Sequence, residues 1–339
     1  MLQNYKKCTF CKSKKLLKLK NATVENSFYA DAIISDLRIT KKQIDKIKVY
    51  ECKKCKIKQH SPWFTQTISR KFYSIIYGQH NRNWNNLIKF INNKTLPDHG
   101  DLFKILRSNI KIQKYAEYNS PFMGLFLNFF NNEYNKNSFF YKNVHNNLIN
   151  YLNSRQLAGK SKLFKKLANT KSKKYSEYIY RAKKANQTKK LIKKYLFVDN
   201  TSLGWGQNDN YKSVNSKSYA QELFDLEILE FDNKIKKFKF DLFGIFHSLD
   251  HTFEPSKVLN FALDSSKYVI VFCHNQIKGI TKQHQFSFTK NFLKFLDQNK
   301  IYTVDITEMI NKNYKSPEIY FLCSKIKKNI RVISKKLYK

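Results

Sequence analysis

Four cysteines near the start of the chain have the spacing of a metal site. Cys8 and Cys11 form one C-x-x-C pair, Cys52 and Cys55 form another, and 40 residues separate the two pairs. Zinc prefers tetrahedral thiolate ligation, and each C-x-x-C turn can present two sulfurs to one ion. The spacing therefore predicts a structural zinc site that is closed by four sulfurs and does no catalysis. Two disulfides are the alternative, which the absence of a secretory signal disfavours.

A second group of residues with reactive side chains lies in the C-terminal half of the chain. It comprises His247, Asp250, His251, His274 and His284. Histidine suits proton transfer because its ordinary pKa lies near neutrality. His247 and His251 are four residues apart, so a helix would place both imidazoles on one face, where they could bind a metal. Their sequence, H-S-L-D-H, is not the H-E-x-x-H metal pattern, and a loop at a strand end does not keep helical spacing.

Strands that alternate with helices must position this second group. A buried strand begins at Phe240, another runs from Tyr268 to Cys273, and a third covers Ile301 to Thr307, with amphipathic helices between them. Such an alternation indicates a parallel sheet covered by helices. Ligands of these sheets bind beyond the carboxyl ends of the strands. All five residues of the second group are expected in loops at that edge.

Composition and charge narrow the classes of function. The chain has 339 residues, enough for two domains, and a formal charge of +39, which favours nucleic-acid binding because Lys and Arg neutralise phosphates. However, only seven of the 64 basic residues are Arg, the usual bidentate reader of bases and phosphates. The Lys-rich, Asn-rich profile is typical of a genome rich in A and T. Nucleic-acid binding therefore remains an alternative that is not favoured.

Two further absences bear on location. The sequence contains no apolar run of the roughly 18–20 residues that a membrane span needs. Its first residues also lack the apolar segment of a secretory signal. We therefore expect a cytoplasmic protein without a membrane span.

The stretch from Phe240 to Thr307 resembles the second half of an S-adenosylmethionine-dependent methyltransferase of the Rossmann-like (class I) group. In that group the fourth strand typically reads F-D-x-I and leads to E-H or D-H. A helix that starts near D-P or E-P, a fifth strand, and a loop with H-x-x-x-F-S or F-T follow. The matching residues here are Phe240, Asp241, Asp250, His251, Glu254, Pro255, His284, Phe288 and Thr289. Sugar C-methyltransferases are also similar at the N-terminus, because two C-x-x-C pairs precede their methyltransferase domain.

This resemblance implies an α/β fold with a Rossmann-like methyltransferase sheet that ends in an antiparallel hairpin. We expect a zinc-knuckle domain in residues 1–60, a mainly helical middle segment in residues 61–190, and the methyltransferase domain in residues 191–339. The hairpin would pair Ile301–Thr307 with Pro317–Cys323.

The resemblance also implies where S-adenosylmethionine binds. The first strand is expected at Lys194–Asp199, so that Asp199, Gly204 and Gly206 contact the methionine part of the cofactor. Glu227, or Asp225 beside it, would hold the ribose hydroxyls from the end of a second strand, and His247 would add a further contact. Two features depart from the family. The first is the position of the two glycines, which are displaced by about two residues from the family's register, where glycines let the backbone approach the cofactor closely. The second is length, because only about 40 residues separate Asp199 from Asp241.

The middle segment contains one break in its helical pattern. The sequence from Glu117 to Phe126 includes Pro121 and Gly124, which interrupt helices. We interpret it as a turn between helices, with a position on the substrate side as the alternative.

The leading hypothesis for function is methyl transfer from S-adenosylmethionine to a small molecule, for which a nucleotide-linked sugar is one acceptor. His284 is the expected general base, because the family carries its base in the loop after the fifth strand. There the family reads Y-H-E-H, whereas this chain has Thr281-Lys282-Gln283-His284 and keeps only the last histidine. A non-catalytic scaffold with a degenerate cofactor site and an RNA-modifying methyltransferase are the two alternatives.

Overall fold

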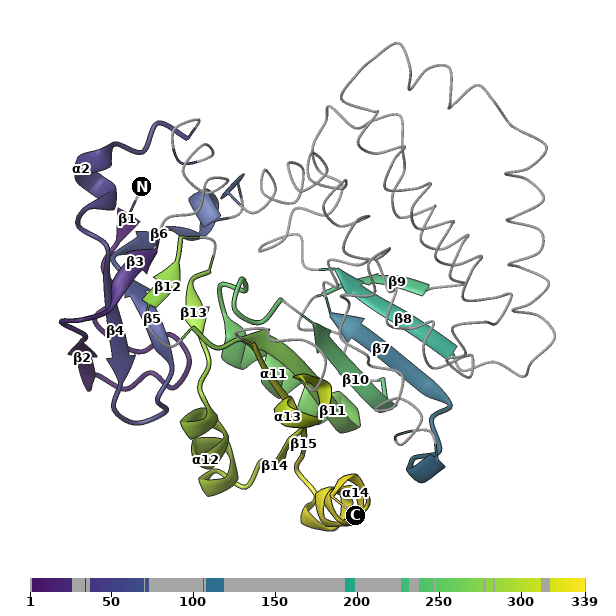
Figure 1. The fold of residues 1–339 in the computed structure, drawn as a ribbon. Helices are drawn as coiled ribbons and strands as arrows, with labels where there is room; N and C mark the ends of the chain where they lie inside the picture. The colour runs from purple at the N-terminus through teal and green to yellow at the C-terminus, as the bar shows by residue number, and fades with distance from the viewer. Residues whose placement is uncertain are drawn as a thin grey trace, which may run out of the picture.

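The computed structural model of the protein describes most of the N-terminal and C-terminal parts of the chain (Figure 1). The described residues are 2–25, 34, 37–69, 71–72, 106, 108–118, 193–198, 227–231, 238–246, 248–276, 279–282, 284–311 and 318–338. Among these residues, no helix is long and apolar enough to cross a membrane.

A seven-stranded mixed sheet forms the centre of the fold. Its strands are β7 (Lys114–Tyr118), β8 (Lys193–Val198), β9 (Glu227–Glu230), β10 (Phe240–Phe246), β11 (Ser266–His274), β14 (Tyr302–Asp305) and β15 (Glu318–Ser324). They lie in the order β14-β15-β11-β10-β7-β8-β9. The strands from β11 to β9 pair in parallel, whereas β15 is antiparallel to both of its neighbours. The predicted antiparallel pairing near the C-terminus is therefore confirmed.

Strands β10 and β11 contain long apolar runs, which are buried because both faces of the sheet are covered. Every residue from Leu242 to Phe246 is buried, as is every residue of Tyr268–Cys273, which is the pattern of strands in the middle of a parallel sheet. Aromatic rings fill much of the space around β10: Phe197 stacks on Phe243 at 5.7 Å between ring centroids, and Phe261 meets Phe197 edge-on at 5.3 Å.

Helices from the C-terminal half pack against this sheet. They are α11 (Pro255–Ser265), α12 (Lys290–Gln298), α13 (Thr307–Asn311) and α14 (Lys327–Leu337). Helix α11 begins with a proline, whose fixed φ suits the first helical position. It packs against β10 and β11 through buried residues at helical spacing, including Val258, Leu259 and Ala262.

The order of strands along the chain corrects one prediction. From β7 the chain adds β8 and β9 on one side, and then returns to place β10 on the other side of β7. The segment Lys194–Asp199 was expected as the first strand; its residues 194–198 instead belong to β8, and Asp199 lies outside the described residues. The strand before it is β7, inside the segment of residues 61–190 that was expected to be mainly helical. Among the described strands, only β9 lies between Asp199 and Asp241. The short separation between these residues therefore fits a sheet that needs one strand, and not two, between β8 and β10.

The N-terminal part forms small sheets that include strands from the C-terminal half. The four-stranded sheet has the order β13-β5-β4-β2, and two-stranded sheets join β1 to β6 and β12 to β3. The bounds are β1 (Leu2–Gln3), β2 (Leu16–Lys18), β3 (Thr23–Glu25), β4 (Lys48–Cys52), β5 (Lys58–Ser61), β6 (Trp63–Phe64), β12 (Gly279–Thr281) and β13 (Phe286–Ser287); the short helix α2 covers Lys41–Ile44. Figure 1 shows β12 and β13 beside these N-terminal strands. The loop after β11 is thus paired with the N-terminal sheets.

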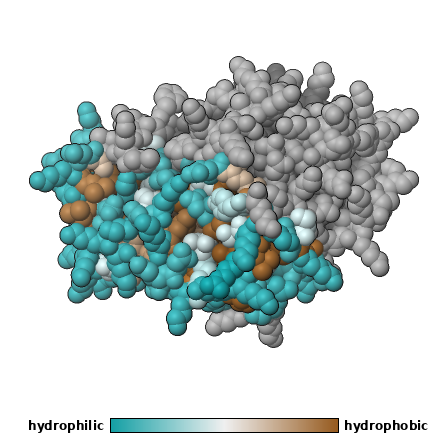
Figure 2. All heavy atoms as spheres, turned by 60° about the horizontal axis from the view of Figure 1, so that its bottom comes forward, coloured by the Kyte–Doolittle hydropathy of each residue, from teal (hydrophilic) through white to brown (hydrophobic). Residues whose placement is uncertain are grey.

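The surface of the described part is mainly polar on one face. Hydrophilic residues cover most of it in Figure 2, and hydrophobic residues appear there in separate patches. The large apolar side chains that are exposed are Leu17, Ile326, Val332 and Tyr338. Most large apolar side chains of the described part are therefore inside, where they hold the loops at the sheet edge in place.

Candidate metal centre and carboxyl-edge site

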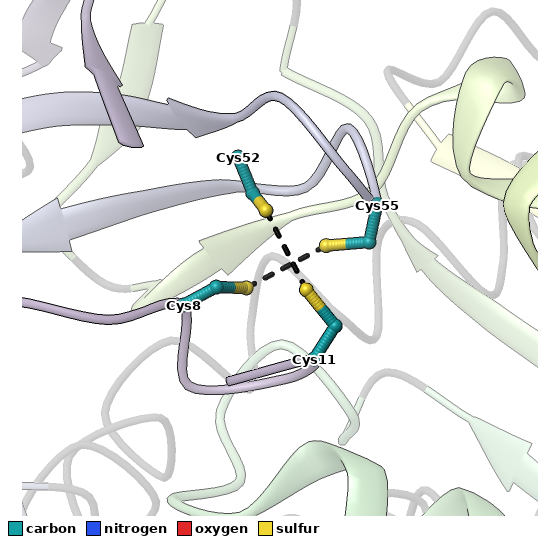
Figure 3. Close-up of side chains that lie close together, drawn as sticks. All are labelled: Cys8, Cys11, Cys52 and Cys55. Atoms are coloured by element: carbon teal, nitrogen blue, oxygen red, sulfur yellow. Dashed lines mark hydrogen bonds between the residues drawn. The ribbon is translucent and has the colours of Figure 1, made fainter. Parts of the chain in front are cut away.

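The four N-terminal cysteines converge on one point. The Sγ atoms of Cys8 and Cys55 lie 3.5 Å apart, as do those of Cys11 and Cys52. Figure 3 shows the two contacts crossing, so that the sulfurs surround a common centre. These distances are too long for disulfides, whose sulfurs are about 2.05 Å apart, and all four cysteines are free. Zinc–sulfur bonds of about 2.3 Å would place tetrahedral sulfurs about 3.8 Å apart, so the geometry suits the predicted zinc ion.

The two C-x-x-C turns are built in the same way. In each turn a lysine directly follows the second cysteine. These residues, Lys12 and Lys56, have left-handed backbone angles, with φ of 59° and 63°. The Lys12 N–H donates to the Cys8 carbonyl at 2.9 Å, and the Lys56 N–H donates to the Cys52 carbonyl at 2.8 Å. Both turns therefore curl so that their sulfurs face each other.

Charge is unevenly shared among these thiols. The hydrogen bond from the Cys55 thiol lowers the pKa of Cys8 to about 6, whereas burial raises the pKa of Cys11 to about 11. The same hydrogen bond raises the pKa of Cys55. A bound cation would favour ionisation of all four thiols.

The edge of the large sheet where a ligand would bind lies beyond β7 and β10. In sheets of this type the crevice forms where the strand order reverses, which here is between these two strands. The loop after β10 is tied to the end of β7, because the Ser248 hydroxyl donates to the Tyr118 carbonyl at 3.2 Å. That loop continues directly into Asp250 and His251.

Four polar side chains meet at this edge: Asp250, His251, His274 and His284. The ring nitrogen Nδ1 of His274 contacts Asp250 Oδ2. The backbone N–H of His274 donates to the same oxygen at 3.2 Å. The Nε2 atom of His251 lies 3.8 Å from Asp250 Oδ1, and that of His284 lies 4.0 Å from Oδ2. One ligand atom from each of the four residues lies within 4.8 Å of all the others.

The loop after β11 is held by hydrogen bonds to both neighbouring parts of the protein. The Gln285 N–H donates to the Asp250 carbonyl at 3.1 Å, and the His60 N–H of β5 donates to the Gln285 carbonyl at 3.2 Å. The Lys58 ammonium donates to the Gln276 carbonyl at 3.1 Å. The N-terminal sheet, the loop after β10 and the loop after β11 therefore meet around the same cluster.

The electrostatics of the cluster separate its members. Burial alone would raise the pKa of Asp250, but the positive charge on His274 and His251 and the His274 hydrogen bond hold it well below its usual range. Burial alone would lower the pKa of His274, but Asp250 raises it. The pKa of His284 is well below its ordinary value, mainly because the ring is buried and also because positive charge on His274 and His251 disfavours a second charge. At neutral pH the cluster thus contains an ionised Asp250 and a neutral His284.

The predicted cofactor residues are only in part described. Asp199, Gly204, Gly206 and His247 lie outside the described residues. Glu227 is the first residue of β9 and pairs with Tyr195 of β8. In chain order β9 is the third described strand of the large sheet, after β7 and β8. Glu227 therefore lies at the amino end of that strand, and the prediction that it ends the second strand is wrong. Asp225 lies outside the described residues.

Sequence reasoning missed the part that β7 plays. Glu117 and Tyr118 belong to this strand, so they do not form a turn between helices; the rest of the segment to Phe126 lies outside the described residues. The signal was the short run K-Y-A-E-Y, which contains two tyrosines, just before the turn residues of N-S-P-F-M-G.

Comparison with known proteins identifies no family. No family model and no curated protein matches the chain. Among solved structures, it is similar to magnesium protoporphyrin IX methyltransferase from Synechocystis PCC 6803, solved with bound SAH. The identity is 11%, the TM-score is 0.27, and the match covers 42% of this chain and 67% of that one. At this level of similarity, the interpretation of the site depends on the chain's own strand order and side chains.

Proposed function

We propose that the protein transfers a methyl group from S-adenosylmethionine to a small molecule. The observation that carries this proposal is the group of Asp250 and three histidines at the carboxyl edge of the sheet, next to the reversal of strand order between β7 and β10. Ligands of open α/β sheets bind at such a reversal. The resemblance of Phe240–Thr307 to Rossmann-like methyltransferases supplies the reaction class.

The strand order changes which residues we propose for the cofactor. With β7 as the first strand, the loop for the methionine part is the one that follows Glu117 and Tyr118. Asp199 comes directly after β8, the second strand, and the family uses an acidic residue there for the ribose hydroxyls. We therefore propose Asp199 as the ribose ligand in place of Glu227. Gly204 and Gly206 follow it in sequence and remain proposed neighbours of the cofactor, together with His247.

His284 is the side chain that we propose accepts a proton from the methyl acceptor. Its Nδ1 atom lies 2.8 Å from the Thr281 hydroxyl, which leaves Nε2 facing the cluster. A general base must lie within reach of the proton that it removes, and the loop position at the sheet edge meets this need. A nucleotide-linked sugar is the acceptor that we propose, by the resemblance to sugar C-methyltransferases.

The four cysteines are proposed to hold a structural zinc ion. Phe10 lies in the turn between Cys8 and Cys11. Its ring meets the ring of Phe292 in α12 edge-on, with the centroids 5.0 Å apart, and this contact joins the cysteine centre to the large sheet's helices. The same N-terminal part supplies β5, which pairs with β13 in the loop that carries His284. Zinc would thus support the reactive loop and take no part in the chemistry.

Calorimetric titration with S-adenosylmethionine and S-adenosylhomocysteine tests the proposal. We expect binding of both compounds, and loss of most of it in Asp199→Ala, because the ribose hydroxyls lose their acceptor. The matched control is Asp264→Asn, a change of an exposed carboxylate that pairs with Lys325. Absence of heat at high micromolar concentrations of both compounds would reject the proposal. If both bind, labelled methyl groups should appear on an added nucleotide sugar, and His284→Asn should abolish transfer without weakening cofactor binding.

A non-catalytic scaffold is the second candidate. The sequence that follows β7, N-S-P-F-M-G, contains a single glycine, Gly124, where the family uses several for close approach to the cofactor. A cofactor that does not bind in the calorimeter, with the cluster and fold intact, would support this candidate.

A further inference from the structure

We propose that Asp250, His251, His274 and His284 bind a divalent transition-metal ion, at a second metal centre separate from the four cysteines. The inference concerns these four side chains alone and does not depend on methyl transfer. Neutral imidazole and carboxylate are the ligands that zinc, iron and nickel accept in proteins. The chemistry of the set therefore points to a first-row divalent ion, and zinc is the probe that we choose.

The positions of the ligand atoms suit such an ion. Metal–ligand bonds of about 2.0–2.1 Å place tetrahedral ligands about 3.3 Å apart. Asp250 lies in the middle of the cluster: Nδ1 of His274 contacts its Oδ2, and the Nε2 atoms of His251 and His284 are 3.8 and 4.0 Å from its oxygens. To reach that spacing, the Nε2 atoms of His251 and His284 must each approach the Asp250 oxygens by less than an ångström, and Nδ1 of His274 must move away from Oδ2. The three rings already face one another, with centroids 3.9 to 6.2 Å apart.

One carboxylate oxygen in the cluster lacks a hydrogen bond. Asp250 is completely buried, and its Oδ1 atom accepts no hydrogen bond from the residues that the structure describes. A buried carboxylate oxygen without a donor is costly. This oxygen lies 3.8 Å from Nε2 of His251, so an ion placed between the two atoms would supply Oδ1 with a partner. The four cysteines show the same arrangement of convergent, buried ligand atoms.

Outer contacts orient two of the histidines as metal ligands are usually oriented. Metal-binding histidines generally use their other ring nitrogen for a hydrogen bond to a carboxylate, carbonyl or water. For His284 that atom is Nδ1, which lies 2.8 Å from the Thr281 hydroxyl. For His274 it is Nε2, which is within ion-pair distance, 3.9 Å, of Oε1 of Glu318 but is too far for a direct hydrogen bond. The Tyr320 hydroxyl donates to the other oxygen of Glu318 and fixes that carboxylate.

Access to the proposed centre is through His274. Its side chain is 20% exposed, whereas those of Asp250, His251 and His284 are at most 9% exposed. An ion there can exchange with solvent and can bind a ligand on that side. The cysteine centre would bind zinc through four thiolates, whereas this centre offers imidazoles and a carboxylate, so the two centres should differ in their response to a chelator.

This centre gives His284 a different role from that of a free base. A ring nitrogen that is bound to a metal has no lone pair for a proton, so Nε2 of His284 acts as the proposed base only in protein without an ion at this centre. A cluster without metal would instead be a hydrogen-bonded group in which Asp250 orients His274. The metal content of the wild-type protein distinguishes these two states without any assumption about the cofactor.

The first test is the metal content and ligand shell of the intact protein. The chain is dialysed against Zn²⁺, freed of excess ion and analysed by elemental analysis and by X-ray absorption at the zinc edge. We expect about two zinc ions per chain, with nitrogen or oxygen ligands at about 2.0–2.1 Å and sulfur ligands at about 2.3 Å in similar numbers. A single zinc ion with a shell of sulfur alone would overturn the proposal.

Variants assign the second ion to the cluster. Asp250→Asn and His274→Gln should each retain one zinc ion with a sulfur shell, and the control Asp264→Asn should retain two. Because Asp250 is buried, Glu318→Gln supplies a milder change beside the centre: it should weaken zinc binding by about 10–100-fold in a chelator competition and leave the cysteine centre unchanged. Two zinc ions in both cluster variants, or unchanged competition in Glu318→Gln, would contradict the assignment. Calorimetry with S-adenosylmethionine is read separately, so failure of the metal centre and failure of methyl transfer give different results.

Discussion

The carboxylate of Asp241 accepts a hydrogen bond from the backbone N–H of Gln113, 128 residues earlier in the chain, at 2.8 Å. The same Oδ2 atom accepts the Lys114 N–H at 3.1 Å, and Oδ1 pairs with the Lys267 ammonium at 2.8 Å. A single side chain at the start of β10 therefore joins the entrances of β7, β10 and β11. These are the three strands whose opposite ends carry the proposed site.

Replacement of this carboxylate should destabilise the protein measurably. Asp241→Asn removes the charge that the two backbone N–H groups and Lys267 bind, and charged hydrogen bonds contribute about 1.5–3 kcal/mol. Since Lys267 is largely exposed, we expect a loss near the lower end of that range in urea unfolding at neutral pH. Asp264→Asn, which breaks the more exposed pair with Lys325, should change stability by less than about 1 kcal/mol. Equal effects of the two changes would show that Asp241 is an ordinary surface charge.

The same residue should make stability depend on acid pH. Burial alone would raise the pKa of Asp241, but the bonds from Lys267, Gln113 and Lys114 lower it below its ordinary value. The stabilisation is therefore complete above the unfolded pKa of about 3.9 and is lost as the pH falls through the lower, folded value. Urea midpoints measured from pH 6 down to pH 3 should fall less steeply in Asp241→Asn than in the wild type. Parallel curves for the two proteins would contradict this linkage.

Gly244 in the middle of β10 should not tolerate a side chain. A Cβ atom there would lie 2.7 Å from the Tyr115 hydroxyl and closer still to the Phe246 ring. Both rings are buried, so Gly244→Ala should cost about 1–3 kcal/mol through overpacking. The double variant with Phe246→Leu frees space beside the new methyl group and should cost less than the sum of the two single changes. Exact additivity in thermal or urea unfolding would show that the two positions do not compete for space.

Loss of the cysteine centre should loosen the loop that carries His284. Cys52 ends β4, β4 pairs with β5, and β5 pairs with β13. Cys52→Ser should therefore increase amide exchange in β5 and β13 and leave β14 and β15 protected, because opening is local to cooperative units. Cys323→Ala in β15, a buried cysteine that belongs to neither proposed metal centre, is the control and should retain one thiolate-bound zinc ion. Uniform exchange across the chain would instead indicate global unfolding.

The C-terminal half of this fold could be predicted from sequence because its elements have strong periods. The buried runs at Phe240–Phe246 and Tyr268–Cys273 and the antiparallel pair at the C-terminus all appear as expected. The convergence of four cysteines could be predicted because their spacing alone limits the geometry. Strand β7 could not, because it is five residues long and includes Lys114 and Glu117. Its burial depends on neighbours that arrive from more than a hundred residues away, such as the Asp241 carboxylate.

The histidine cluster was visible in sequence only as separate residues at strand ends. Local spacing suggested only a pair of His247 and His251, which the sequence itself disfavoured as a metal site, whereas the structure brings His251 next to His274 and His284 through Asp250. The outer residues that orient them, Thr281 and Glu318, carry no sequence signal, since hydroxyls and carboxylates are common in loops. Parallel pairing of β10 with β11 supplies this proximity, and no local pattern encodes it.

The joining of Lys58 to Gln276, 218 residues further along the chain, also bears on how the protein is made. Strands β5 and β3 leave the ribosome early, but their partners β13 and β12 are synthesised only near the end. The N-terminal segment therefore cannot complete its sheets during most of translation, and contacts of such long sequence separation form slowly. If the four thiolates bind an ion early, this N-terminal segment would stay compact until its partner strands are synthesised. Early metal binding would then reduce misassembly of the nascent chain.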